Sequence, residues 1–194
     1  MPYPPSHREQ VKEKIIESAR RLFNCRGFNA VSIDDVMAEA GLTRGSFYTY
    51  FDSKSALFAE SVTRFVSEKR ATRAESASID ARAPGVAAKI ARNYLSHRQF
   101  DHADEECPMI GLATDVGLTD PQVRLAFEGA LRLMVDIFEQ GMRRKGEEAR
   151  PRALAISALC VGGLVVARSI EDRVFADEVR EAALAIALSL GNWT

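Results

Sequence analysis

The segment over residues 32–54 constrains the fold more than any other part of this 194-residue chain. Ser32 is a suitable helix N-cap, and Asp35 three residues later can complete a capping box. Apolar side chains at helical spacing then predict a short helix over residues 33–40. Gly41 follows where a helix end favours a left-handed residue, and a second short helix can begin two residues later. Two short helices joined by a tight glycine turn are typical of a helix-turn-helix unit.

The second of these helices carries side chains that suit contact with DNA. Arg44 can form paired hydrogen bonds to a guanine, and Gly45 lets the backbone approach a groove closely. Taken singly, Lys54 is more often a solvated lysine, and Tyr48 and Tyr50 could equally be packing residues. Taken together, the order and spacing of these groups favour DNA. The residues expected at the DNA are Thr43, Arg44, Gly45, Ser46, Tyr48, Tyr50 and Lys54.

A wider stretch, over about residues 11–60, resembles the DNA-binding domain of the tetracycline-repressor (TetR) family of bacterial regulators. The residues that carry the resemblance are SARRLFNCRGFNAVSIDDV, followed by AGLTRGSFYTYFDSKSALF. The resemblance implies an all-α homodimer with a helix-turn-helix domain over residues 1–54 that binds double-stranded operator DNA. Residues 55–194 would form the domain that binds a small-molecule effector and dimerises. The family's DNA contacts fall on the residues named above and on Ser32, and Tyr50 stands where a histidine is common.

The charge distribution and the cysteines agree with this interpretation. The net charge is −1, but residues 1–73 hold 12 basic and 9 acidic residues, whereas residues 74–194 hold 14 and 18. The asymmetry favours DNA at the N-terminal end. The first ten residues have no apolar core, so we expect no signal peptide. Three cysteines without paired spacing suit a reducing compartment, and the sequence predicts a cytoplasmic protein.

Helical periodicity continues along most of the chain. The first helix is expected over residues 7–26, where Gly27 ends it and Phe28 can fold back onto its apolar stripe. The remaining helices are expected over residues 54–72, 86–98, 109–117, 120–142, 153–167 and 177–190, with a loop over 75–85. The resemblance makes helix 54–72 the connection between the effector site and the DNA-binding domain.

The apolar run over residues 153–167 contains one polar side chain, Ser157. It is shorter than the ~20 residues that span a bilayer, so we expect a buried helix and no membrane partner. Adjacent glycines inside a helix cost about 1 kcal/mol each, which is reasonable where another helix approaches closely. The last two helices resemble the family's dimer-forming pair, and burial within one subunit is the alternative. The predicted interface residues are Gly162, Gly163, Val166, Ala183 and Ala187.

Large apolar side chains on the C-terminal helices are first of all core residues. A second use is to line an effector pocket for a small, mostly apolar ligand. The residues proposed for that pocket are Tyr94, Met109, Phe127, Met134 and Phe138. The sequence therefore predicts a transcriptional regulator, in the first place a repressor that the ligand releases from its operator.

Three other functional classes have less support from the sequence. A metal- or redox-responsive regulator could use the segment from His97 to Cys107, which also contains Asp101, His102, Asp104, Glu105 and Glu106. That segment has no recognised ligand spacing, and its acidic side chains disfavour a thiolate, so we expect neither a metal nor a cofactor. An enzyme is disfavoured because no nucleophile motif or phosphate loop is present. A DNA-binding protein without any ligand is a further alternative.

Overall fold

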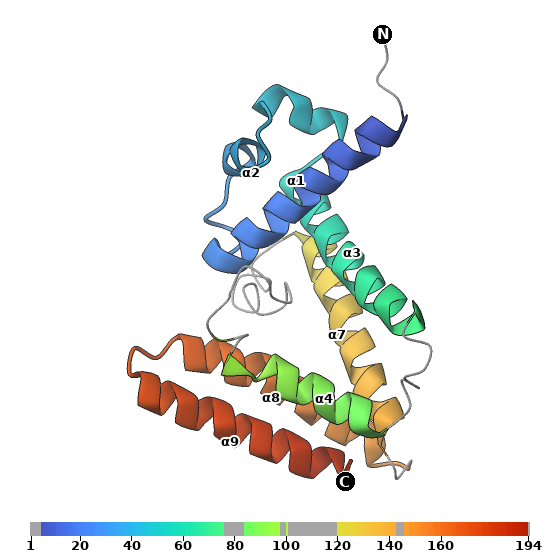
Figure 1. Cartoon of the computed structure of the whole chain (residues 1–194), viewed down its shortest axis with the longest axis vertical. Coiled ribbons are helices and arrows are strands. Elements are labelled where there is room, and N and C mark those ends of the chain that lie inside the picture. Colours follow the sequence, from blue (N-terminus) through green and yellow to red (C-terminus); the bar gives the residue numbers. More distant parts are fainter. Residues whose placement is uncertain (1–4, 76–83, 98–99, 101–119, 143–145, 194) are drawn as a thin grey trace. The chain divides into compact units, whose positions relative to one another are not determined.

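The computed structural model describes residues 5–75, 84–97, 100, 120–142 and 146–193, and these residues contain helices and no strand (Figure 1). The all-α fold expected from the sequence is therefore confirmed. The helices are α1 (Pro5–Arg26), α2 (Ile33–Glu39), the 3₁₀ helix η1 (Arg44–Thr49), α3 (Lys54–Glu75), α4 (Pro84–Tyr94), α7 (Pro121–Gly141), α8 (Ala149–Arg168) and α9 (Arg173–Gly191).

The described residues belong to two compact units. The first holds the residues up to Phe65 and the beginning of α7 up to Glu128, and the second holds the others. Helices α3 and α7 therefore each contribute residues to both units. The compact units divide the chain within α3, after Phe65, and within α7, after Glu128. The boundary predicted from the sequence, between residues 54 and 55, lies at the start of α3 instead. It remains a prediction about which residues bind DNA and which bind the effector.

The first unit is built on the buried face of α1. Ile15, Ala19 and Phe23 recur at four-residue spacing, and all three side chains are buried. Phe23, Phe28 and Phe58 form an aromatic cluster with ring centroids 5.5–5.6 Å apart. Phe28 reaches the cluster because Gly27 adopts a φ of +79°, which turns the chain back after α1 as the sequence predicts.

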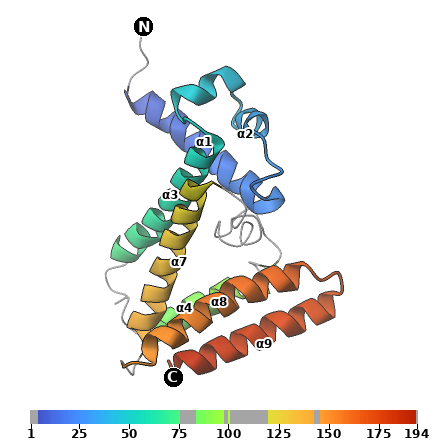
Figure 2. The same cartoon turned by 180° about the vertical axis from the view of Figure 1, so that it is seen from behind.

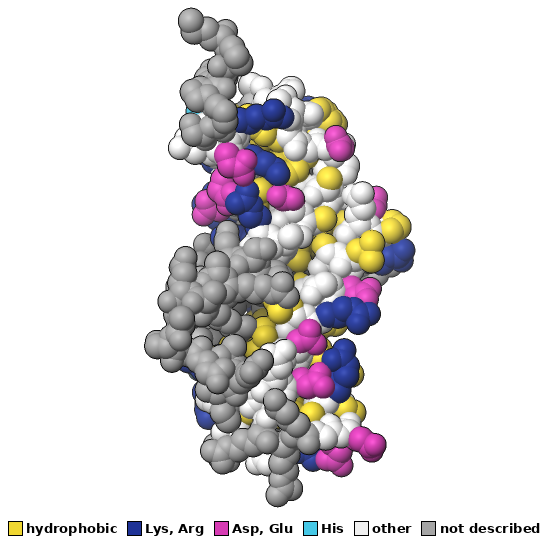
Figure 3. All heavy atoms as spheres, turned by 90° about the vertical axis from the view of Figure 1, so that its right-hand side faces the viewer, with side chains coloured by type: hydrophobic (Ala, Val, Ile, Leu, Met, Phe, Trp, Pro, Cys, Tyr) yellow, Lys and Arg dark blue, Asp and Glu magenta, His cyan; other side chains and the backbone are white. Residues whose placement is uncertain are grey.

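Ion pairs fix the polar side of α1 in the same unit. Arg64 of α3 lies 2.9 Å from the Glu9 carboxylate and 2.7 Å from that of Glu13. Arg21 pairs with Glu39 of α2 at 2.9 Å. Figure 3 shows basic and acidic side chains interspersed on one face of the molecule. Exposed pairs of this kind contribute about 0.2–1 kcal/mol each, so they adjust helix orientation more than they determine stability.

In the second unit, α8 and α9 form an antiparallel pair with α4 behind α8 (Figure 2). A Cβ added at Gly163 would stand 2.7 Å from the Ala183 Cβ and 3.4 Å from the Leu95 Cδ2. Ala183 and Ala187 are buried in the same chain. Gly163, Ala183 and Ala187 therefore have packing partners within one subunit, and their place at a dimer interface remains a prediction. These small residues let α8 and α9 of one subunit approach each other.

Gly162 and Val166 lie on a different side of α8. Nothing in the described chain lies within 4 Å of the position that a Cβ at Gly162 would take, and Val166 is exposed. These two residues of the predicted interface are therefore accessible from outside the subunit.

Helix α8 is longer than its apolar run. At 20 residues it meets the length and composition of a membrane-spanning helix, as core helices of soluble proteins also do. Its inner face packs on neighbouring helices of the same unit, and Arg150, Arg152 and Arg168 lie at its two ends. The residues buried from α8 include Ala153, Ile156, Cys160, Leu164 and Ala167. This pattern is that of a core helix.

Candidate nucleic-acid interface

The N-terminus of α2 is held by a complete capping box. The Ser32 hydroxyl accepts a hydrogen bond from the Asp35 backbone N–H at 3.1 Å. In return, the Asp35 carboxylate accepts from the Ser32 backbone N–H at 2.8 Å and from the Ser32 hydroxyl. These hydrogen bonds hold the pKa of Asp35 below its usual value. The predicted cap is confirmed, and the Ser32 hydroxyl is already used inside the protein.

The turn after α2 leads directly into η1. Gly41 has a φ of +66°, and the Leu42 N–H donates to the Met37 carbonyl at 2.8 Å. Thr43 is the N-cap of η1, with extended backbone and no side-chain cap hydrogen bond. The Ser46 hydroxyl donates to the Thr43 carbonyl at 2.7 Å and closes the first turn. The second helix expected from the sequence is present, as one 3₁₀ segment and not as an α-helix.

One side of η1 is buried, and the other carries most of the predicted DNA contacts. Phe47 is fully buried, while the neighbouring Tyr48 is 59% exposed. Gly45 is exposed, and no residue that the structure describes lies within 4 Å of the position that a Cβ there would take. Packing among the described residues therefore gives no reason for a glycine at residue 45, whereas close approach to another molecule would. Thr43 and Arg44 are also exposed, and Ser46 and Tyr50 are half-buried.

Arg44 has a partner on the preceding helix. Its guanidinium pairs with the Asp34 carboxylate at 2.5 Å, and the two side chains are 61% and 55% exposed. The head group is therefore accessible to a ligand but held above the N-terminus of α2.

Lys54 contacts the backbone of its own domain. Its ammonium donates to the Phe28 carbonyl at 2.8 Å and to the Val31 carbonyl at 2.9 Å. It also lies 4.3 Å from the centroid of the Phe28 ring. These contacts offset the unfavourable position of a cation at the start of α3. A phosphate is therefore not needed to explain this lysine, and its contact with DNA remains a prediction.

We expect Lys54→Met to lower the free energy of unfolding by about 1–2 kcal/mol, because two part-buried carbonyls lose a charged donor. Urea denaturation followed by circular dichroism would measure the change, with Lys14→Met on the exposed side of α1 as the matched control. Unchanged stability, combined with weaker DNA binding and a flatter salt dependence, would instead identify Lys54 as a phosphate contact.

The predicted effector residues lie in both units. Tyr94, Met134 and Phe138 belong to the second unit, where the latter two are buried and Tyr94 is half-buried. Phe127 belongs to the first unit and is half-buried, and Met109 lies outside the described residues. Their assignment to a pocket remains a prediction.

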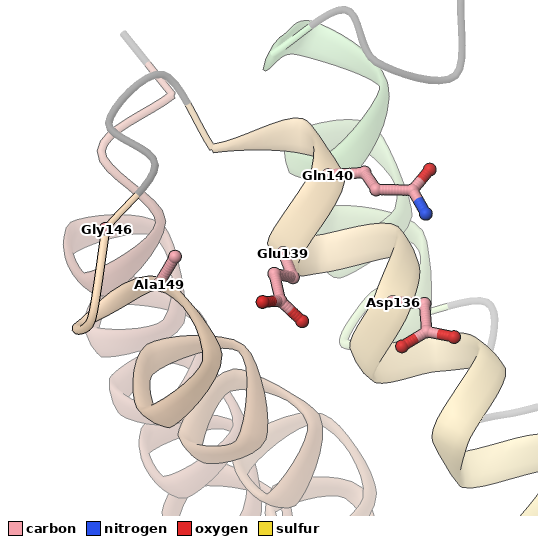
Figure 4. A pocket seen from close by; sticks show the side chains of 5 residues that line it. All are labelled: Asp136, Glu139, Gln140, Gly146 and Ala149. Atoms are coloured by element: carbon pink, nitrogen blue, oxygen red, sulfur yellow. The ribbon is translucent and has the colours of Figure 1, made fainter.

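A pocket that the structure does describe is lined by three polar side chains and two small residues (Figure 4). It has a volume of about 260 Å³ and lies where α7 ends and α8 begins. Arg150 pairs with Glu139 at 2.9 Å and with Asp136 at 3.5 Å beside it. None of the predicted effector residues that the structure describes lines this pocket. Its lining consists of Asp136, Glu139, Gln140, Gly146 and Ala149.

The segment considered for metal or redox sensing lies mostly outside the described residues, and of its candidate ligands the structure describes His97. Its Nε2 lies 2.9 Å from the Arg180 guanidinium, and its Nδ1 lies 3.4 Å from the Asp177 carboxylate. Arg180 also donates to the Leu95 carbonyl at 2.7 Å and is only 3% exposed. In the described part of the chain, no three ligand-type side chains gather as a metal site would require.

Sequence reasoning did not identify Arg180 as a buried residue. Its three-residue spacing from Asp177 was the available signal, but such pairs are ordinary on helix surfaces. Cys160 is buried, and burial raises its pKa to about 12, so this thiol is unreactive in the folded protein.

Comparison with known proteins agrees with the geometry of the N-terminal unit. Residues 15–61 match the family described as "Bacterial regulatory proteins, tetR family". This match covers α2, the glycine turn and η1. Residues 15–61 therefore form a TetR-family domain.

Individual relatives of this chain are transcriptional regulators. The uncharacterized HTH-type transcriptional regulator YdgC of Bacillus subtilis is 42% identical over 67 residues, which are 31% of this chain and 34% of YdgC. IcaR of Staphylococcus aureus, the negative transcriptional regulator of the biofilm operon icaADBC, is 35% identical over 52 residues, or 27% and 28% of the two chains. The chain thus spans about a third of the length of these relatives.

The fold comparison extends over nearly the whole chain. The crystal structure of Escherichia coli NemR in its reduced form aligns with a TM-score of 0.74 and 22% identity, covering 93% of this chain and 96% of that one. At this identity the likeness concerns the fold alone. The matched family and the named relatives are regulatory proteins.

Proposed function

We propose that this protein is a cytoplasmic, homodimeric transcriptional repressor that binds operator DNA through η1 and the turn before it. The observation that carries the proposal is the exposed side of η1, where Thr43, Arg44 and Tyr48 surround a glycine that packing does not require. An arginine can read a guanine edge, and hydroxyl groups can reach phosphates. The relative IcaR is a negative transcriptional regulator, which supports repression over activation.

The exposed apolar side of α8 and α9 supports the homodimer. Exposed large apolar side chains there include Leu154, Val166, Phe175 and Ile186. On α8, Leu154 and Val166 belong to a stripe of apolar and small residues at four-residue spacing, which lies on one face of the helix. That stripe consists of Leu154, Ala158, Gly162 and Val166. Covering it with the same face of a second copy would form a four-helix interface about a two-fold axis.

We further propose that a small, mostly apolar ligand releases the protein from its operator. The predicted pocket residues supply buried, adaptable side chains, of which Met134 and Phe138 are placed in the second unit. The coupling between such sites is typically about 1–3 kcal/mol, and it must be reciprocal. Thermal-shift screening of apolar metabolites, with and without operator DNA, tests this. A ligand whose affinity ignores the DNA contradicts the coupling.

The DNA proposal is tested by footprinting the protein on the DNA upstream of its own gene and then measuring the Arg44→Ala variant. We expect this substitution to weaken operator binding by about 1–3 kcal/mol and to relax the preference at one base pair of each half-site. Fluorescence anisotropy at several salt concentrations provides the measurement. Equal losses on operator and on unrelated DNA would show that Arg44 does not read a base.

A further inference from the structure

One side chain joins the start of α1 to the end of η1. The Arg8 guanidinium donates from Nη2 to the Thr49 carbonyl at 3.1 Å, across 41 residues of sequence. Thr49 is the last residue of η1, where backbone carbonyls have no partner within the helix. Arg8 and Thr49 are both exposed, and Thr49 follows Tyr48, one of the predicted DNA contacts. The hydrogen bond therefore places the Arg8 cation at the end of η1.

The partner of Arg8 does not neutralise its positive charge. A carbonyl is uncharged, and within the described part of the chain no carboxylate pairs with Arg8. Arg21, Arg44 and Arg64 of the same unit differ, because each of them pairs with a carboxylate. A guanidinium has five N–H donors in a planar fork, and the Thr49 carbonyl takes one of them. The other donors can bind an anion while the bond to the carbonyl is kept.

We propose that Arg8 is a further DNA-binding residue, whose guanidinium binds a backbone phosphate beside the bases that η1 reads. The inference rests on the proposed function of η1. Because Thr49 already holds the Arg8 side chain, binding a phosphate costs less side-chain entropy than it would for an arginine in solvent. The planar fork of an arginine also fits two phosphate oxygens at once. Phosphates are present in every sequence, so this contact adds affinity and fixes the position of α1 on the DNA without adding specificity.

The test uses two substitutions that separate the charge of Arg8 from its hydrogen bond. Arg8→Lys keeps the positive charge, whereas Arg8→Gln keeps an amide donor and loses the charge. Arg92→Gln is the matched control, because Arg92 is an exposed arginine on α4 of the other compact unit. It changes the net charge by the same amount as Arg8→Gln. Each full-length protein would be titrated at several salt concentrations with the footprinted duplex and with a duplex of equal length and composition in shuffled order.

We expect Arg8→Gln to flatten the salt dependence by a slope of about 0.9 for each subunit, because each subunit loses one phosphate contact. Near physiological salt, affinity should fall about three- to tenfold for each subunit, on the footprinted and the shuffled duplex alike. The ratio of the two affinities should therefore stay the same. Arg8→Lys should keep the wild-type slope, and Arg92→Gln should leave both slope and affinity close to those of the wild type.

Equal slopes in Arg8→Gln and Arg92→Gln would overturn the inference. A loss confined to the footprinted duplex would overturn it too, because Arg8 would then act only by positioning η1 for its base contacts. A slope that falls as far in Arg8→Lys as in Arg8→Gln would exclude a role for the charge. A wild-type protein that binds neither duplex would refute the proposed function itself, and this is seen before any variant is compared.

Discussion

Replacing Phe47 with alanine should lower the free energy of unfolding of the DNA-binding unit by about 3–5 kcal/mol and abolish operator binding. The Phe47 side chain is fully buried, with its ring 5.3 Å from that of Tyr48 and 5.9 Å from that of Phe51. Its carbonyl also accepts from the N–H groups of Tyr50 and Phe51. Short 3₁₀ helices have weak hydrogen-bond geometry, and η1 lacks a side-chain cap. Its position therefore depends on this one buried ring.

Tyr48→Ala is the matched control for this expectation, because Tyr48 is adjacent in sequence but largely exposed. It should weaken DNA binding while leaving the unfolding transition nearly unchanged. Chemical denaturation monitored by circular dichroism, together with anisotropy on the footprinted duplex, would measure both variants. A Phe47→Ala protein with normal stability and normal operator affinity would show that packing does not position η1.

Leucine substitutions at the adjacent glycines of α8, Gly162 and Gly163, should also have large effects, but on different properties. A leucine at residue 163 would clash with Ala183 of the same chain, and overpacking of this kind costs about 1–3 kcal/mol. A Cβ at residue 162 meets nothing within 4 Å among the described residues, so Gly162→Leu should gain about 1 kcal/mol of helix propensity. In the proposed dimer, however, residue 162 faces the partner, so Gly162→Leu should shift the equilibrium toward monomers.

The two variants are therefore controls for each other. The single tryptophan, Trp193, packs 5.7 Å from Phe138 in the same unit and reports unfolding by its fluorescence. Sedimentation velocity would give the oligomeric state at matched concentrations. A Gly163→Leu protein of normal stability would contradict the packing of α8 on α9. An intact Gly162→Leu dimer would mean that this stripe is not the interface.

Short-range features of this protein were predictable from the sequence because neighbouring residues determine them. The capping box depends on Ser32 and Asp35, which are three residues apart and meet in any helix that begins there. The left-handed turns at Gly27 and Gly41 require residues without a Cβ, whatever packs around them. The helix-turn-helix pattern and the all-α class are built from such local signals, so they were predicted correctly.

Long-range features were decided only by tertiary packing. The Lys54 ammonium finds its carbonyl partners 26 and 23 residues away, and Arg180 reaches the Leu95 carbonyl across 85 residues. No periodicity reports such partners, because they depend on how separate helices approach. Gly162 and Gly163 are equivalent in the sequence, yet side chains there point about 100° apart around the helix. The packing of α8 on α9 therefore decided that Gly163 meets α9 and that Gly162 remains accessible from outside.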